Sequence, residues 1–294
     1  MSFAAACSSP GGSNGSAASG AAGAGGSDGS DGTAQGATGD GTGSGTSDGS
    51  AGDGSGGDGS ATASVTTRTI TAFQGGSFLS ANYDPVTGLF TANIGGTGVQ
   101  LSRFQTADYG SMLAMRDAMG VHNAYFAEGS GTQVVAYSGG LAGQVTQVAG
   151  FARSADTELP LTGSASFSGQ YAGFTPTRRV NGDVSLAVDF AGATVAGSIS
   201  NRVFRQRPDN AFDATNPLST LVLEQAALRP DGTFAGATGG GQIVNGQQLW
   251  NPATGTFAGL IGGATGTEAV GTVTLQHNAP SGARIEEIGG FFAR

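Results

Sequence analysis

The feature that most constrains this chain is a long segment that cannot fold by itself. From Ser8 to Ser64 there is no Val, Leu, Ile, Met, Phe, Tyr or Trp, and the run is almost entirely Gly, Ser, Ala, Thr and Asp. Ordering the backbone costs roughly 1–2 kcal/mol per residue, and this run has no apolar surface whose burial would offset that cost. We therefore predict a disordered, low-complexity tether over residues 1–61, so that folding is confined to the rest of the chain.

The only cysteine of the chain, Cys7, directly precedes the low-complexity run that begins at Ser8. The residues Ala4-Ala5-Ala6-Cys7, with Ser8 and Ser9 after them, resemble the lipobox of a bacterial lipoprotein. The resemblance implies a signal peptide, a lipid (palmitate) anchor on Cys7, and a surface-exposed position on the bacterial outer membrane. The alternative is a free cysteine in a disordered N-terminal segment. In either case Cys7 cannot form an internal disulfide, because it has no partner.

Composition excludes several classes of function. The twelve basic residues are all arginine, so a P-loop lysine or a Schiff-base lysine is absent. The formal charge is -9, six of the acidic residues lie in the tether, and there is no basic tract. An acidic chain of this kind is a poor candidate for binding nucleic acid. No run of eighteen apolar residues occurs, so a membrane-spanning helix is not expected.

Period-two alternation dominates the C-terminal part. In Asp183–Phe190, the apolar residues Val184, Leu186, Val188 and Phe190 alternate with Asp183, Ser185, Ala187 and Asp189. Val180-Asn181-Gly182 is interpreted as a turn before this strand. The predicted strands are Thr162–Tyr171, Asp183–Phe190, Thr194–Ser200, Ser219–Leu228, Thr233–Ala237, Thr256–Gly262, Glu268–Gln276 and Ile285–Ala293.

Eight antiparallel strands joined mostly by short turns are the number that closes into a small up-and-down barrel. We therefore predict an all-β protein with an eight-stranded β-barrel over residues 159–294. A β-sandwich is the main alternative. Closure of the barrel would also remove the exposed strand edges that favour aggregation.

Residues 62–158 have a different pattern, which predicts a smaller mixed β subdomain with one helix. Strands are expected at Arg68–Phe73, Gly88–Ile94 and Gln133–Tyr137. A helix is expected at Ala107–Met119, because Met112, Met115 and Met119 are spaced to share one helical face and Gly120 stands at the C-cap position.

The C-terminal part also resembles a known family. The run Leu159-Pro160-Leu161-Thr162-Gly163-Ser164-Ala165-Ser166-Phe167-Ser168-Gly169 is similar to the entry strand of the transferrin-binding protein B-like β-barrel domain, with Phe167 in place of the usual Tyr. Phe257–Gly262, Glu268–Gly271 and the terminal Gly289–Arg294 are similar to later strands of that family. The resemblance covers about residues 159–294. It implies a surface-exposed lipoprotein with an eight-stranded barrel beside a smaller handle subdomain, and it carries over no ligand.

Candidate site residues are few. His122 and His277 have no metal-ligand neighbour at useful spacing and are interpreted as solvated loop histidines. Glu286 and Glu287 are adjacent, so on a strand they face opposite sides and cannot act as a carboxylate pair. The segment Asn201–Pro217 is interpreted as a long loop. Its arginine and aromatic residues form either an exposed patch of the composition enriched at binding hot spots, or a solvated loop whose guanidiniums pair with Asp209 and Asp213. The candidate ligand-binding residues are Arg202, Phe204, Arg205, Arg207, Phe212 and, on another loop, Trp250, for which a plug at the barrel rim is the alternative.

The sequence thus predicts a non-enzymatic, monomeric lipoprotein at the cell surface. It would bind a protein or a small-molecule ligand through barrel and handle loops, with no catalytic residue, metal or cofactor. The alternative is a structural or adhesive outer-surface protein without a dedicated small ligand.

Overall fold

The computed structural model describes residues 74, 78–141, 144–154, 157–206, 212–240, 244–245, 248–249, 251–278 and 282–294. The expectations for Cys7, for the tether and for a strand at Arg68–Phe73 lie outside these residues. The described part is almost entirely β-structure, and it contains one short 3₁₀ turn, Gln105–Ala107. This agrees with the predicted all-β class.

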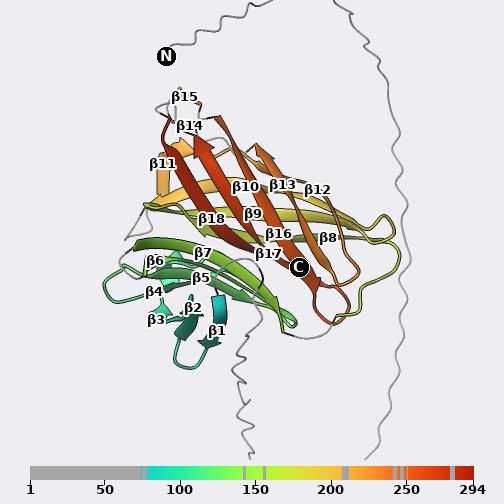
Figure 1. Cartoon of the computed structure of the whole chain (residues 1–294), viewed down its shortest axis with the longest axis horizontal. Coiled ribbons are helices and arrows are strands. Elements are labelled where there is room, and N and C mark those ends of the chain that lie inside the picture. The colour runs from blue at the N-terminus through green and yellow to red at the C-terminus, as the bar shows by residue number, and fades with distance from the viewer. Residues whose placement is uncertain are drawn as a thin grey trace, which may run out of the picture. The chain divides into compact units, whose positions relative to one another are not determined.

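The C-terminal part forms a closed eight-stranded antiparallel barrel, as predicted. The strands pair in the order β8-β9-β10-β12-β13-β16-β17-β18, and β18 pairs again with β8 to close the ring. Each of the eight predicted strands corresponds to one of them (Figure 1). Their bounds are β8 Ser164–Phe174, β9 Arg178–Asp189, β10 Thr194–Gln206, β12 Leu221–Ala227, β13 Thr233–Gly240, β16 Asn251–Gly262, β17 Glu268–Asn278 and β18 Arg284–Ala293.

Side chains of alternating positions fill the barrel interior. On β9, Val184, Leu186 and Val188 are buried, whereas Ser185 and Asp189 are exposed. An eight-stranded barrel is just wide enough for its side chains to fill the inside. Aromatic and aliphatic residues from all eight strands make up this core, among them Phe167, Tyr171, Ile199, Leu223, Phe234, Phe257, Val273 and Phe291.

Two sequence interpretations near β9 and β10 are wrong. Val180-Asn181-Gly182 is not a turn, because β9 runs unbroken from Arg178 to Asp189. The supposed loop from Asn201 is strand up to Gln206, and β11 (Phe212–Pro217) pairs back onto β10. Asn201 has a positive φ of 50° at a register shift, so β10 bends there and continues instead of ending. Asn201 on β10 and Asn181-Gly182 on β9 lie at this bulge. Their residue types alone do not distinguish a bulge from a turn.

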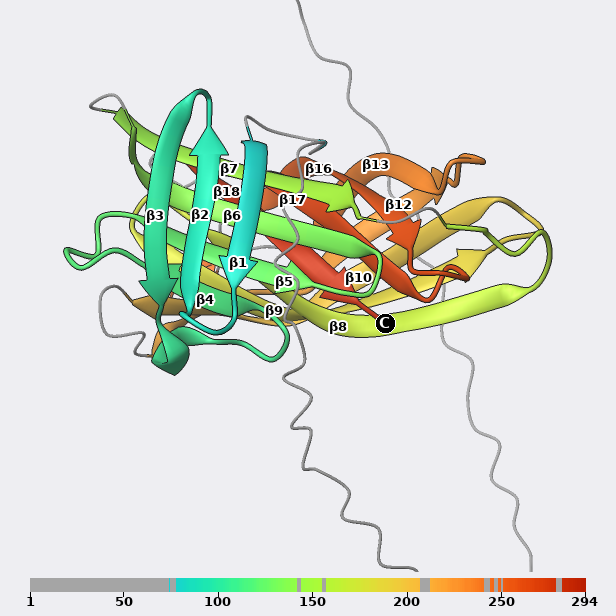
Figure 2. The same ribbon diagram turned by 90° about the horizontal axis from the view of Figure 1, so that it is seen from below.

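A second sheet has seven antiparallel strands in chain order. Gln74 forms an isolated bridge to Phe151 on the seventh strand, so the sheet curls back toward its beginning (Figure 2). The predicted strands at Gly88–Ile94 and Gln133–Tyr137 correspond to β2 and β6. The bounds are β1 Phe78–Asp84, β2 Leu89–Ile94, β3 Thr97–Arg103, β4 Leu113–Arg116, β5 Asn123–Glu128, β6 Thr132–Leu141 and β7 Gln144–Arg153.

The predicted helix at Ala107–Met119 does not form. A turn follows the 3₁₀ segment, and β4 occupies the middle of the range. Met112 and Met115 are buried in different clusters, and Met119 is 80% exposed. The methionine spacing fits one face of a helix, but tertiary packing on the two sides of a sheet determines the structure here.

The two faces of the second sheet bury different clusters. On β6, Val134 and Ala136 pack with barrel residues, whereas Val135 and Tyr137 face the inside of the curled sheet. The barrel wall under β6 and β7 is therefore buried on both sides. This explains the adjacent phenylalanines of β18, because Phe291 belongs to the barrel core and Phe292 to the cluster under the sheet.

A buried carboxylate joins the sheet to the barrel. Glu268, at the start of β17, accepts hydrogen bonds from the backbone N–H and hydroxyl of Ser130, from the N–H of Gly131 and from the hydroxyl of Thr132, at 2.6–3.2 Å. Burial raises the pKa of Glu268, but these four donors outweigh that effect and lower it. The loop between β5 and β6 is thus fixed to the barrel by a charged group.

Candidate functional site

Four polar side chains meet inside one end of the barrel. They are Tyr171 on β8, Arg202 on β10, His277 on β17 and Glu287 on β18. Nη2 of Arg202 donates to both Glu287 carboxylate oxygens, at 2.8 and 2.7 Å. The Tyr171 hydroxyl donates to Oε1 at 2.8 Å, and Nε2 of His277 lies 2.9 Å from Oε2. The Arg202 and Glu287 side chains have no exposed surface. We call these four residues the barrel cluster.

The electrostatics of the barrel cluster depend on Glu287. Burial raises the pKa of Glu287, but the Arg202 guanidinium and the His277 imidazole outweigh it and lower the pKa from 4.5 to about 2. Burial, together with the charge of Glu287, raises the pKa of Tyr171 well above its ordinary value of 10.0. The cluster therefore holds an ionised Glu287 and a neutral Tyr171 hydroxyl at neutral pH.

Two glycines make room for the barrel cluster. A Cβ at Gly182 would touch the Arg202 side chain, and a Cβ at Gly289 would overlap the Tyr171 ring. The charged groups are thus enclosed by backbone and apolar side chains, and Arg202 and Glu287 neutralise each other. Because the ion pair is enclosed and its two charges are directed at each other, we interpret the barrel cluster as structural; removal of one partner would leave an uncompensated buried charge.

Of the predicted arginine and aromatic residues, the structure describes the side chains of Arg202, Phe204 and Arg205, and the first two are buried. Arg202 belongs to the barrel cluster, and Phe204 is buried in the barrel core, with the Arg178 guanidinium 5.0 Å from its ring centre. Arg205 is partly exposed on β10. Phe212 lies on β11, where side chains are not described, and Arg207 and Trp250 lie outside the described residues.

His277 is not a solvated loop residue, whereas His122 does lie in the loop between β4 and β5. His277 is fully buried in the barrel cluster. His122 is half-buried, and its Nδ1 lies 2.6 Å from the Tyr137 hydroxyl. Burial, with a smaller effect of the Asp117 charge, raises the pKa of Tyr137 to about 12. The expectation that Glu286 and Glu287 face opposite sides is confirmed, because Glu286 is exposed and Glu287 is buried.

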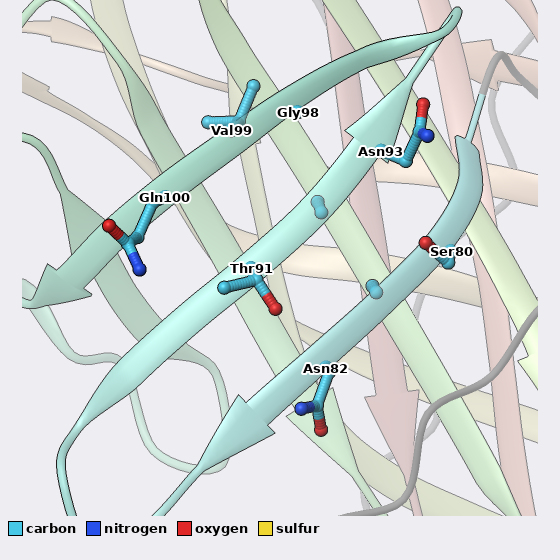
Figure 3. A pocket seen from close by; sticks show the side chains of 9 residues that line it. Ser80, Asn82, Thr91, Asn93, Gly98, Val99 and Gln100 are labelled. Atoms are coloured by element: carbon cyan, nitrogen blue, oxygen red, sulfur yellow. The ribbon is translucent and has the colours of Figure 1, made fainter.

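A shallow depression of about 380 Å³ lies on the outer face of β1, β2 and β3 (Figure 3). Strand register places its polar side chains in two cross-strand rows. Asn82, Thr91 and Gln100 form the first row. Ser80, Asn93 and Gly98 form the second. No charged residue lines the depression. We call this surface the polar face.

Most side chains of the polar face have no partner within the described part of the protein. Asn93 Oδ1 accepts the backbone N–H of Gly96 at 3.0 Å, which stabilises the turn between β2 and β3. Ser80, Thr91 and Gln100 make no side-chain hydrogen bond to another described residue. The Oδ1 atom of Asn82 is buried and also lacks a partner there. The polar face thus presents donors and acceptors that the described fold does not use.

Sequence reasoning did not identify the polar face, because it predicted neither β1 nor β3. The signal that could have predicted these strands is a polar residue at alternate positions in three consecutive short segments. The turns Asp84–Gly88 and Gly95-Gly96 separate these segments. Among the described residues, there is no group of three or more His, Cys, Asp or Glu side chains that could hold a metal ion. The same residues include no helix long and apolar enough to cross a membrane.

Comparison with known proteins gives a likeness at the level of fold. No family model matches the chain, and no curated protein matches it. Among solved structures, the Trp-176-Ala mutant of the vaccine antigen transferrin binding protein B from Haemophilus parasuis Hp5 is 12% identical, with a TM-score of 0.43. The match covers 77% of this chain and 45% of that one.

Intact Ap-TbpB, with its N and C lobes, is 11% identical with a TM-score of 0.42; the match covers 75% of this chain and 45% of that one. The chain therefore spans less than half the length of the solved proteins it matches. At these identities the likeness concerns strand arrangement only, and it assigns neither ligand nor partner.

Proposed function

We propose that this chain is a non-enzymatic lipoprotein, exposed on the bacterial outer membrane, that binds a ligand or partner on the outside of its fold. The observation that carries the proposal is the filled barrel interior. Barrel-core side chains such as Tyr171, Phe257 and Phe291 are almost completely buried, and the barrel cluster occupies the space between them at one end. A barrel of this size and packing leaves binding to outer surfaces and loops.

The rigidity of the frame supports the same proposal. Glu268 and its four donors fix one end of the seven-stranded sheet to β17. Arg179 Nη2 donates to Asn123 Oδ1 at 2.7 Å, and the Tyr109 hydroxyl donates to Asp183 at 2.7 Å. The sheet is therefore held on the barrel by charged and polar contacts as well as by packing. A rigid scaffold that presents a surface loses little conformational entropy when a partner binds.

The membrane anchor in the proposal rests on Cys7. Expressed with a functional lipoprotein signal, the wild-type chain is expected in the membrane fraction, with acyl chains on Cys7. Stable anchoring needs more than one acyl chain, and the multiply acylated cysteine of bacterial lipoproteins provides this. Cys7→Ser should move the protein to the soluble fraction, as mass spectrometry and fractionation would show. An unmodified, soluble wild type would remove the anchor from the proposal.

A crosslinking experiment tests the binding role. A photoreactive amino acid replaces Gln100 on the polar face of the full-length, membrane-anchored protein, and a matched variant carries it at Gln276 on β17. Both side chains are exposed. On irradiated cells in their natural medium, position 100 is expected to give a defined crosslinked product that position 276 does not. Equal or absent products at both positions would favour the alternative, a structural or adhesive surface protein without a dedicated ligand.

A further inference from the structure

The polar face has the chemistry of a site for an uncharged, hydroxyl-rich molecule. Asn and Gln side chains each offer two N–H donors and a carbonyl acceptor, and Ser and Thr hydroxyls both donate and accept. The lining of the depression has no charged and no aromatic residue. A charged ligand would lose hydration here without gaining an opposite charge, so the lining selects against ions.

Its geometry suits a ligand that extends across strands. Neighbouring strands lie about 4.8 Å apart, so the row Asn82, Thr91 and Gln100 spans roughly 10 Å. Gly98 ends the second row without a side chain, and open space lies where its Cβ would stand. The result is a shallow trough lined by polar side chains, and Figure 3 shows these side chains along the three strands. An elongated molecule with hydroxyls on one side can contact several of these groups together.

Asn82 supplies a separate observation. Its Oδ1 atom is buried, yet it has no hydrogen-bond partner in the described part of the protein. Buried polar atoms are nearly always paired, with protein groups or with ordered water. Rotation of the Asn82 amide would turn Oδ1 toward the depression, where a ligand hydroxyl would donate the missing hydrogen bond. Protein–protein interfaces, in contrast, rely on Trp, Tyr and Arg hot spots that pair with hot spots on the partner. The lining of the depression contains none of these three residue types.

We infer that the polar face of β1–β3 binds a neutral oligosaccharide through hydrogen bonds from Asn82, Thr91, Gln100 and Ser80. This inference deepens the proposed function by naming the ligand class of the external surface. Because the trough is shallow, single-site affinity is modest, and a tethered surface protein would gain by binding repeated units of a polysaccharide.

Two variants and one control test the inference on the full chain. Asn82→Ala combined with Gln100→Ala removes two hydrogen-bonding groups, and Gly98→Leu fills the trough without straining the backbone, since open space lies there. Gln276→Ala is the matched control, because Gln276 is an exposed amide on the barrel wall. Binding is measured on an array of neutral oligosaccharides and to immobilised dextran and mannan, with heparin as the anionic comparison.

The expected result is binding to at least one neutral glycan. Removal of two hydrogen bonds should weaken it about tenfold, because each net bond contributes a factor of several. The Gly98→Leu variant should weaken it similarly, whereas Gln276→Ala should bind like wild type, and all variants should keep the wild-type melting temperature. Absence of neutral-glycan binding, preference for heparin, or equal binding by all variants would overturn the inference. A polypeptide crosslinked at position 100 without glycan binding would leave the proposed function standing and reject only the oligosaccharide.

Discussion

Glu287→Ala is expected to lower the free energy of unfolding by about 3–5 kcal/mol, because it leaves a buried guanidinium without its counter-ion. In the wild type, Arg202 Nη2 contacts both carboxylate oxygens of Glu287 within 2.8 Å, and neither side chain is exposed. The truncation also removes the acceptor of the Tyr171 hydroxyl and the partner of His277 Nε2. Urea unfolding of the variant and of the wild type measures the difference.

The neighbouring residue is the matched control. Glu286 is exposed on the opposite face of β18, so Glu286→Ala should change the free energy of unfolding by no more than about 0.5 kcal/mol. A double change of Arg202→Met and Glu287→Leu should recover much of the loss, since well-packed apolar residues often replace a buried ion pair at little cost. Equal destabilisation by Glu286→Ala and Glu287→Ala would contradict the enclosed ion pair.

The pH dependence of stability provides a second test of the Arg202–Glu287 ion pair. The pKa of Glu287 is lowered from 4.5 to about 2 in the folded protein, so the unfolded state binds the proton more readily. Ionised Glu287 therefore contributes on the order of 3 kcal/mol to the free energy of unfolding. This contribution is fully present above about pH 4.5 and is lost as the pH falls toward 2. Glu287→Gln should lack this part of the pH dependence. Glu268, Asp84 and Asp231, whose pKa values are also lowered, retain theirs in both proteins.

The barrel strands were predictable because each depends on a local pattern. Val184, Leu186 and Val188 alternate with polar or small residues, and a short turn follows, so local sequence carries both the strand and its inward face. The methionines of 107–119 show the limit of such patterns. Their spacing is compatible with a helix, but Met112 and Met115 pack on different sides of the sheet, and only tertiary contacts reveal that.

The barrel cluster could not be predicted, because its members come from strands far apart in the chain. Arg202 and Glu287 are separated by 85 residues, and Arg202 lies in a segment whose Asn, Pro and Arg content is typical of an exposed loop. A bulge at Asn201 lets β10 continue and directs Arg202 into the barrel. Burial of a charge depends on a partner, and local composition does not show whether one is present.

The polar face could not be predicted for a different reason. Its residues are individually ordinary for the solvent side of a strand, and their grouping depends on the register that places Asn82 beside Thr91 and Thr91 beside Gln100. A pattern of polar residues indicates which side of a strand faces water. It does not indicate which polar residues of neighbouring strands stand side by side.

The second large effect is expected inside the barrel, where Leu186→Ala should lower the free energy of unfolding by about 2–5 kcal/mol. Leu186 is 1% exposed and lies opposite Phe167 on β8 and Gly197 on β10. A Cβ at Gly197 would already touch the Leu186 side chain. Gly197 itself has no side chain that could move into the space left by truncation, so the cavity should remain. We therefore expect a loss in the free energy of unfolding near the upper end of this range.

Ser185→Ala is the control for Leu186→Ala, because Ser185 is the exposed neighbour on the same strand and its truncation should cost no more than about 0.5 kcal/mol. Phe190 is a weaker test of the barrel than its place in the alternation suggests. It lies in the turn after β9 and is only partly buried against the core. A one-residue shift of register would exchange the two faces of β9. Comparable losses for Leu186→Ala and Ser185→Ala in urea unfolding would therefore show that the inward face of β9 is wrongly assigned.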